Sequence, residues 1–201
     1  TNTTNNQSLS SIIALTNGGF VVTWSSDQDG SDYNIYAQRY DNNGTAQGNE
    51  FRVNSYTTNS QAASSITKLT NGDFVVVWQS DGQDGSYNGV YAQRYDANGV
   101  TLGNEFLVNS YTGDSQFEPS ITALTDGGFA VAWTSVMRYG IYAQLYDANG
   151  MTRSSEFRVN TFYSNSEFQS PSIIALTNSG FAVTWSVPDK EGSVMGIFAK
   201  R

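Results

Sequence analysis

The chain has 201 residues, of which 13% are aromatic and only 14% charged, and its formal net charge is −8 with a sequence pI near 4.3. An acidic chain repels nucleic-acid phosphates and anionic lipid, and the absence of Cys and His excludes disulfides, thiol chemistry and imidazole bases or ligands. No apolar stretch approaches the roughly 18 residues of a membrane-spanning helix, which leaves cations, neutral glycans and other proteins as partners.

One sequence unit is repeated four times. Each copy contains one tryptophan, and the four lie 54, 55 and 52 residues apart: Trp24, Trp78, Trp133 and Trp185. Fixed periods of this size are typical of propeller blades or repeat arrays. We therefore expect a single domain over residues 1–201, and the repeats are approximately 1–54, 55–109, 110–160 and 161–201.

The first two segments of each unit read as strands. The first mixes small and β-branched residues, as expected of a crowded inner strand; its copies are Ser11–Leu15, Ser65–Leu69, Ser120–Leu124 and Ser172–Leu176. The second is apolar at nearly every position, which predicts burial on both faces. Its copies are Phe20–Trp24, Phe74–Trp78, Phe129–Trp133 and Phe181–Trp185. The tryptophans are expected in the core between blades.

Two further strands complete the unit. The third is predicted at Ile35–Tyr40, Val90–Tyr95, Ile141–Tyr146 and Ile197–Arg201. The fourth is predicted at Glu50–Val53, Glu105–Val108 and Glu156–Val159, with no copy in the last repeat. Arg39, Arg94 and Arg201 share one column of the third strand, and we expect them to pair with Glu50 or Glu105.

Turn signals join these strands in sequence order. Asn17-Gly18 and its copies predict two-residue hairpins, and Asp41–Gly44 and its copies predict slightly longer ones with Gly in the left-handed region. The result is an all-β fold, a β-propeller of four-stranded antiparallel meander blades with one blade lacking its outer strand.

Three arrangements of the blades stay open at this point. The four could close into a ring, form part of a larger ring, or be completed by a strand from a neighbouring chain at an open sheet edge. The chain starts at Thr1 within a repeat, so we expect a processed or trimmed piece.

The repeat motif SI.AL.(N/D)GGF.V.W.S…IYAQ.YD.NG….EF.VN resembles tandem repeats of large bacterial secreted or surface proteins, often exported by type I secretion with calcium-binding repeats elsewhere. The segment Pro119–Trp133 is also similar to the inner half of a sialidase-type blade. The resemblance implies an extracellular or bacterial cell-surface protein. It does not supply a sialidase site, because the S-x-D-x-G-x-T-W box and an arginine cluster are missing.

The loop between the second and third strands is the least repeated part of the unit. Its first two copies carry alternating carboxylates around glycines, which resemble a calcium loop because a hard cation needs several converging oxygens. The candidate calcium ligands are Asp27, Asp29, Asp32, Asp81 and Asp84. The alternative is an acidic solvated turn whose side chains bond their own backbone.

Amides and aromatics cluster around the connection from the fourth strand to the next first strand. They suit a sugar, because flat rings stack on it and amides bond its hydroxyls. The candidate ligand-binding residues are Tyr56, Tyr111, Tyr163, Gln7, Gln61 and Gln116. The alternative is that the tyrosines pack between blades and the glutamines cap the strand entrance.

Catalysis is not expected from the sequence, since the paired carboxylates lie in loops predicted to be solvated. We predict a non-catalytic extracellular binding or adhesion module, with a glycan or protein ligand at the loop face and calcium assisting the loops. The alternative is a structural, self-assembling repeat module completed by strand exchange, forming a homo-oligomer through an open sheet edge. A sialidase-like glycosidase ranks below both.

Overall fold

The computed structural model describes residues 5–30, 32–161, 170–177, 180–188 and 195–201. These residues form four antiparallel sheets, which confirms the all-β propeller architecture. Within this part of the chain no helix is long and apolar enough to cross a bilayer.

Blade 1 contains β1 (Gln7–Ala14), β2 (Phe20–Ser26), β3 (Asn34–Tyr40) and β4 (Ala46–Arg52). Blade 2 contains β5 (Gln61–Lys68), β6 (Phe74–Asp81), β7 (Asn88–Tyr95) and β8 (Phe106–Leu107).

The last two blades follow the same order. Blade 3 contains β9 (Gln116–Ala123), β10 (Phe129–Ser135), β11 (Gly140–Tyr146) and β12 (Phe157–Arg158). Blade 4 has three described strands, β13 (Ser172–Ala175), β14 (Phe181–Pro188) and β15 (Met195–Lys200). The outer strands β8 and β12 are shorter than the sequence predicted, whereas β4 is longer.

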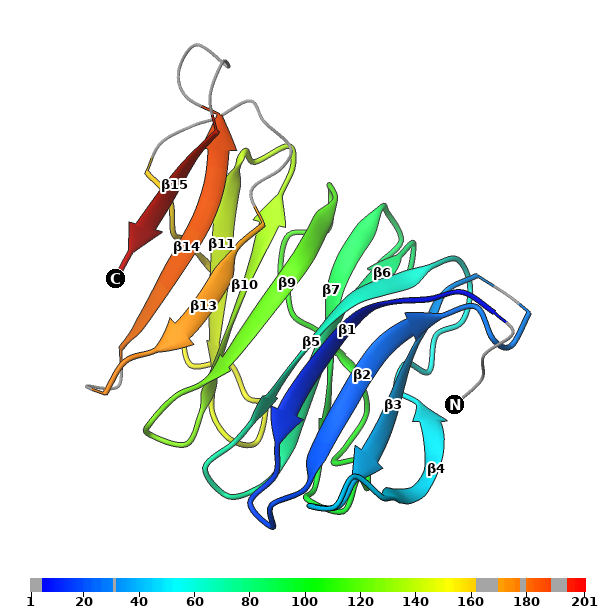
Figure 1. Ribbon diagram of the computed structural model, residues 1–201. Coiled ribbons are helices and arrows are strands. Elements are labelled where there is room, and N and C mark those ends of the chain that lie inside the picture. The colour runs from blue at the N-terminus through cyan, green and yellow to red at the C-terminus, as the bar shows by residue number, and fades with distance from the viewer. Residues whose placement is uncertain (1–4, 31, 162–169, 178–179, 189–194) are drawn as a thin grey trace.

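The inner strand of each blade packs against the inner strand of the next. β1 contacts β5, β5 contacts β9 and β9 contacts β13, so the four blades form a row (Figure 1). β1 and β13 stand at opposite ends of this row, and the N and C ends lie with them. The blades therefore form an open arc, and the closed four-bladed ring that the sequence left open is not the observed arrangement.

Each blade has two chemically different faces. In blade 2 the aromatic face, which carries Phe74, Trp78 and Tyr95, packs on blade 1, and the aliphatic face, which carries Val75 and Val77, packs on blade 3. We keep these names for the same positions in every blade. Trp78, Trp133 and Trp185 are nearly fully buried in these seams, with exposed fractions of 0%, 0% and 7%, which confirms their predicted core role between blades. Trp24, which is 6% exposed, lies on the face of blade 1 that no other blade covers.

Polar bonds cross the same seams at repeated positions. The Tyr146 hydroxyl donates to the Val108 carbonyl at 3.0 Å, and Tyr95 makes the matching bond to Val53 at 3.4 Å. Arg94 donates to the Asn149 carbonyl on the hairpin of the next blade at 2.7 Å, and Arg39 makes the matching bond to Asn98. The predicted pairing of these arginines with Glu50 or Glu105 is therefore wrong, because each side chain reaches across the seam to a backbone acceptor.

The first hairpin of each unit also differs from the prediction. Of the Asn17-Gly18 pair only Gly18 has positive φ, at 86°. The Gly18 amide donates to the Leu15 carbonyl, and the Leu15 amide donates to the Gly19 carbonyl. The loop therefore has three residues, 16–18: a tight turn that ends in the left-handed Gly18. The twist of such a loop also suits antiparallel strands.

The inner strands β1, β5 and β9 have a β-bulge at the same position, and Ser170, just before β13, occupies the equivalent position in blade 4. In each blade the residue at this position is a non-glycine with positive φ, which is rare and costs backbone strain. These residues are Leu9, Ala63, Glu118 and Ser170, at φ 53°, 54°, 54° and 31°. Because all four blades share the left-handed residue at this position, it belongs to the scaffold, and the side chain is what differs between copies.

Seam packing predicts a large cost for losing one tryptophan. Trp133→Ala should lower the free energy of unfolding by about 3–5 kcal/mol, because a fully buried ring leaves a cavity between blades 2 and 3. Met151→Ala, at a hairpin position that is 67% exposed, should change it by less than about 0.5 kcal/mol. Urea unfolding of both variants measures the difference, and equal losses would contradict the seam as the source of stability.

Candidate active site

The loops after the second strand and the connections after the fourth strand emerge at one end of the arc, because the strands alternate in direction. Buried asparagines fix this end. The side-chain oxygens of Asn54, Asn109 and Asn160 accept the amides of Ile35, Val90 and Ile141 at 2.7, 2.7 and 3.0 Å. The loop end is therefore a rigid platform on which variable side chains stand.

The glutamines predicted to bind a ligand lie at this end, but two of them lie beneath its surface. Gln61 and Gln116 are 0% and 1% exposed, and their side-chain oxygens accept Asn54 and Asn109 at 3.1 and 2.9 Å. Gln61 also donates to the Thr58 carbonyl at 3.0 Å. Gln7 is exposed at the start of β1.

The predicted tyrosines are less uniform. Tyr56 is half-buried, and its carbonyl accepts Asn54 at 2.7 Å. Tyr111 is 42% exposed, with the Arg138 guanidinium 5.1 Å from its ring centroid. Tyr163 lies outside the described residues. The structure therefore does not bring the described tyrosines and glutamines together on one accessible surface.

The predicted calcium ligands of blade 1 bond protein groups. The Asp27 carboxylate accepts the backbone and side-chain amides of Asn6, both at 2.9 Å, which ties the chain start to the loop. Asp29 accepts Asn34 at 3.1 Å and lies 3.6 Å from Arg52. The Asp32 carbonyl also accepts Asn34, at 3.2 Å.

In blade 2, Asp81 ends β6, and its amide donates to the Ser60 carbonyl at 3.0 Å. One Asp84 oxygen accepts the Ser86 amide at 3.1 Å. In the part of the chain that the structure describes, no group of three acidic side chains converges as a metal site would require.

A cleft of about 350 Å³ opens at the loop end between blades 2 and 3. Its volume falls in the range of small-molecule sites, and its wall combines apolar rings with a few polar groups. Tyr87 and Met137 are 59% and 58% exposed on its rim. The lining residues are Tyr87, Asn88, Ser115, Phe117, Val136 and Met137.

Asp84 belongs to the loop that supplies one wall of this cleft. Its second carboxylate oxygen is buried and has no hydrogen-bond partner among the described residues. It lies against Gly89, where an added Cβ would stand 2.9 Å from it. Burial, with smaller effects of Asp84 and Glu105, raises the pKa of Tyr91 to about 12, so the nearby phenol is neutral at physiological pH.

Glu118 stands beside the opposite wall, directly after Phe117 on β9. It is the one carboxylate on the inner strands as the structure describes them. The Ser170 amide and hydroxyl of blade 4 donate to its carboxylate at 3.1 and 2.8 Å, and its own amide donates to Gln79 of blade 2 at 3.2 Å. Glu118 is thereby fixed from both neighbouring blades.

Sequence reasoning passed over Glu118 and the cleft. The signal was present as a break in a repeated column, where Leu9 and Ala63 precede an acidic residue. Phe117 likewise stands where the earlier copies have Ser8 and Ala62. The repeat template drew attention to what the copies share, whereas the candidate site lies where one copy departs from them.

Blade 3 carries a second charged group at this end. Arg138 forms an ion pair with Glu156, and its guanidinium stacks 3.7 Å from the Tyr142 ring centroid. Although burial favours the neutral acid, hydrogen bonds from Arg138 and Ser110 hold the pKa of Glu156 below its ordinary value of 4.5. Glu156 is therefore a charged structural anchor for the loop rather than a proton donor near neutral pH.

Solved structures of similar fold are glycan-processing propellers. A Hadza microbial sialidase matches with a TM-score of 0.64 and 14% identity over 97% of this chain and 44% of its own. The family 93 α-L-arabinofuranosidase of Fusarium graminearum, solved with arabinobiose, matches with a TM-score of 0.67 and 12% identity over 98% and 58%. An α-L-arabinanase of Penicillium chrysogenum, solved with arabinobiose, matches with a TM-score of 0.64 and 14% identity over 98% of this chain and 57% of its own.

No protein-family model and no curated protein matches the chain. The chain spans about half the length of these three solved proteins, and at such identities the likeness establishes the fold. The predictions of a non-catalytic binding or adhesion module, and of a self-assembling repeat completed by strand exchange, are nevertheless wrong. The blades are arranged as in glycoside hydrolases. The sequence argument against catalysis had rested on the missing sialidase motif and on carboxylate pairs in loops predicted to be solvated.

The lowered pKa of Glu156 predicts a pH-dependent stability difference. Arg138→Met should lower the free energy of unfolding by about 1–3 kcal/mol at neutral pH, because it removes a charged hydrogen-bond donor from a largely buried carboxylate. A carboxyl group with a lowered folded-state pKa stabilises the fold above its unfolded pKa and loses this effect as the pH falls through the folded value. The difference between wild type and variant should therefore shrink below about pH 4.5.

The matched control is Arg153→Met, because Arg153 pairs with Asp126 where both side chains are about a third exposed. Its cost should stay below about 1 kcal/mol. Urea unfolding of the three proteins at neutral and acidic pH gives the comparison. A cost for Arg138→Met that is the same at both pH values would show that lost packing on Tyr142, rather than the ion pair, dominates.

Proposed function

We propose that this chain is part of a carbohydrate-active propeller that hydrolyses glycosidic bonds, and that the glycan lies in the cleft between blades 2 and 3. The observation that carries the proposal is the aromatic-lined cleft between blades 2 and 3, and the chain that lines it also carries Asp84, three residues before Tyr87, and Glu118, directly after Phe117. The solved neighbours support the class of substrate, since by their names they are a sialidase, an arabinofuranosidase and an arabinanase.

The lining residues suit a sugar. The rings of Tyr87 and Phe117 offer flat apolar surfaces on which a pyranose or furanose face stacks. Asn88 and Ser115 supply amide and hydroxyl groups that bond sugar hydroxyls. The net charge of −8 favours a neutral glycan over an anionic one. An arabinan-type chain therefore fits the cleft better than a sialoside.

Hydrolysis needs one carboxylic acid and one carboxylate. Glu118 takes the acid role: its carboxyl group turns from Ser170 of blade 4 toward the cleft and donates a proton to the glycosidic oxygen as the bond from the anomeric carbon to that oxygen breaks. Asp84 takes the base role: its second oxygen, which is buried against Gly89, has to reach the cleft to take a proton from the water that adds to the anomeric carbon. The products are a free reducing sugar and the shortened glycan. After the step Glu118 has lost a proton and Asp84 has gained one.

The test is hydrolysis of arabinan and of aryl α-L-arabinofuranoside by the purified chain, with an aryl sialoside in parallel. Glu118→Gln and Asp84→Asn should each lower kcat/KM at least about 100-fold, because each removes a general acid or base. Asp73→Asn is the control, since Asp73 bonds Asn71 in an exposed hairpin turn at the other end of blade 2.

Circular dichroism and thermal melting verify that the variants are folded. Loss of activity in both site variants with full activity in the control supports the assignment. An active chain that tolerates both substitutions would contradict the roles of Asp84 and Glu118. A folded chain that releases no reducing sugar from any of the three substrates would contradict the glycosidase proposal itself.

A further inference from the structure

The aromatic face of blade 1 is built like the aromatic faces that are buried inside the arc, yet it is open. Ile12 on β1 is 63% exposed. The residues at the same position in blades 2, 3 and 4 are Ile66, Ile121 and Ile173, which are 6%, 7% and 8% exposed. All four are isoleucines at the same position of an inner strand. They differ in that a preceding blade covers the last three, whereas none covers Ile12.

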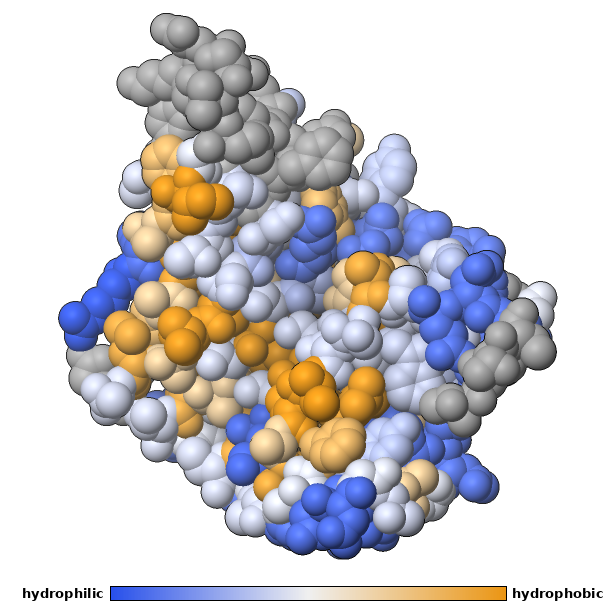
Figure 2. All heavy atoms as spheres, viewed as in Figure 1, coloured by the Kyte–Doolittle hydropathy of each residue, from blue (hydrophilic) through white to orange (hydrophobic). Residues whose placement is uncertain are grey.

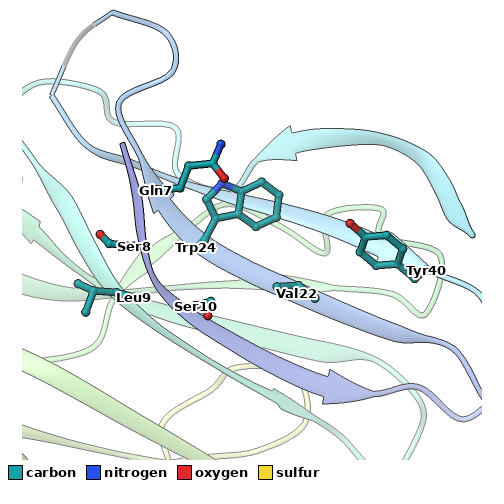
Figure 3. A pocket seen from close by; sticks show the side chains of 7 residues that line it. All are labelled: Gln7, Ser8, Leu9, Ser10, Val22, Trp24 and Tyr40. Carbon is teal, nitrogen blue, oxygen red and sulfur yellow. The ribbon is translucent and has the colours of Figure 1, made fainter. Parts of the chain in front are cut away.

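A hollow of about 320 Å³ lies on this open face (Figure 3). The Gln7 side chain lies beside the Trp24 indole, and Tyr40 stands further along the same face. The equivalents of Val22, Trp24 and Tyr40 in blade 2 are buried against blade 1. The lining residues are Gln7, Ser8, Leu9, Ser10, Val22, Trp24 and Tyr40. The hollow is thus the position that a preceding blade fills at every internal seam.

Blade 4 presents the opposite half of the seam. Ile197 on β15 is 76% exposed, whereas its equivalents Ile35, Val90 and Ile141 are all 0% exposed beneath the next blade. Ile174, on the same aliphatic face, is 64% exposed. Figure 2 shows hydrophobic residues gathered over the β13–β15 end of the molecule as well as over the lower part of β1.

We propose that the aliphatic face of blade 4 docks on the aromatic face of blade 1 of a second copy of this chain. The argument is continuity with an interface that the molecule already contains three times, since blades 1 and 2, 2 and 3, and 3 and 4 join aliphatic face to aromatic face. The contact joins whole sheet faces and exchanges no strand. It is also separate from the cleft between blades 2 and 3.

The polar bonds of the internal seams have matching groups on the two open faces. Arg39 and Arg94 donate to the carbonyls of Asn98 and Asn149 on the hairpin of the following blade. Arg201 occupies the same column in blade 4, and Asn43 occupies the acceptor position in blade 1. Arg201 of one copy therefore donates to the Asn43 carbonyl of the next when the faces dock in the internal register.

Joining unlike faces has a consequence for the assembly. A head-to-tail contact leaves one open face of each kind on a pair, and a ring forms when those two also meet. Two copies with four blades each make eight blades, which lies within the four to eight of typical propellers. The expected assembly is therefore a closed dimer held by two identical seams.

The test is the mass of the chain by light scattering and sedimentation over a concentration series. The wild type should have twice the 21.9 kDa of one chain. Ile12→Asp and Ile197→Asp should each be monomeric, with the dimer dissociation constant raised at least tenfold. Both residues are exposed in the single chain, so both variants should keep the circular dichroism spectrum of the wild type, while their melting temperatures fall only by the stabilisation that dimer formation gives. Met151→Asp, an exposed apolar residue on a hairpin away from both faces, should remain dimeric.

Mixing the two monomeric variants distinguishes unlike from like faces. The Ile12→Asp chain keeps its blade 4 face and the Ile197→Asp chain keeps its blade 1 face, so an equimolar mixture should form a one-to-one dimer through one intact seam. A wild type that is monomeric throughout the series would overturn the proposal. So would a dimer that survives either single substitution, because a contact between two copies of one face needs only that face.

Discussion

The packing of an aromatic sheet face on an aliphatic one is the interaction on which the rest of the structure depends. A single blade buries neither face alone, so each blade depends on packing against at least one neighbour. The large rings supply most of the buried apolar area, and the small aliphatic side chains opposite leave room for them. The repeated hydrogen bonds from Tyr and Arg side chains to backbone carbonyls fix how adjacent blades are aligned, because these bonds form only when the two blades stand in one register.

This constraint decides where the copies are free to differ. Strand positions face a neighbouring blade and tolerate little change, whereas loop residues stand on buried asparagine anchors and face solvent. The cleft arises at this boundary. Tyr87 and Met137 come from loops, Phe117 comes from the start of an inner strand, and Glu118 follows at the bulge. A bulge position that is shared between blades thus carries an acidic side chain, Glu118, in one of them.

The repeat period, the strand order and the buried tryptophans could be predicted from the sequence because each depends on a local pattern that recurs four times. The turn around Gly18 was mispredicted, since Asn-Gly pairs fit more than one loop geometry. The arginine partners were mispredicted because a long side chain reaches across the seam to a hairpin more than 50 residues away. The cleft could not be predicted, because its two walls meet only through the docking of separate blades.

In the open arc, the proposed cleft and the two open sheet faces lie on different blades. The proposed cleft lies between blades 2 and 3, where the seam is internal to one chain and all the lining residues come from that chain. The open faces belong to blades 1 and 4. Glu118 nevertheless connects the two regions, because Ser170 of blade 4 holds its carboxylate. The blade that presents the open aliphatic face is therefore the same blade that holds the Glu118 carboxylate in place.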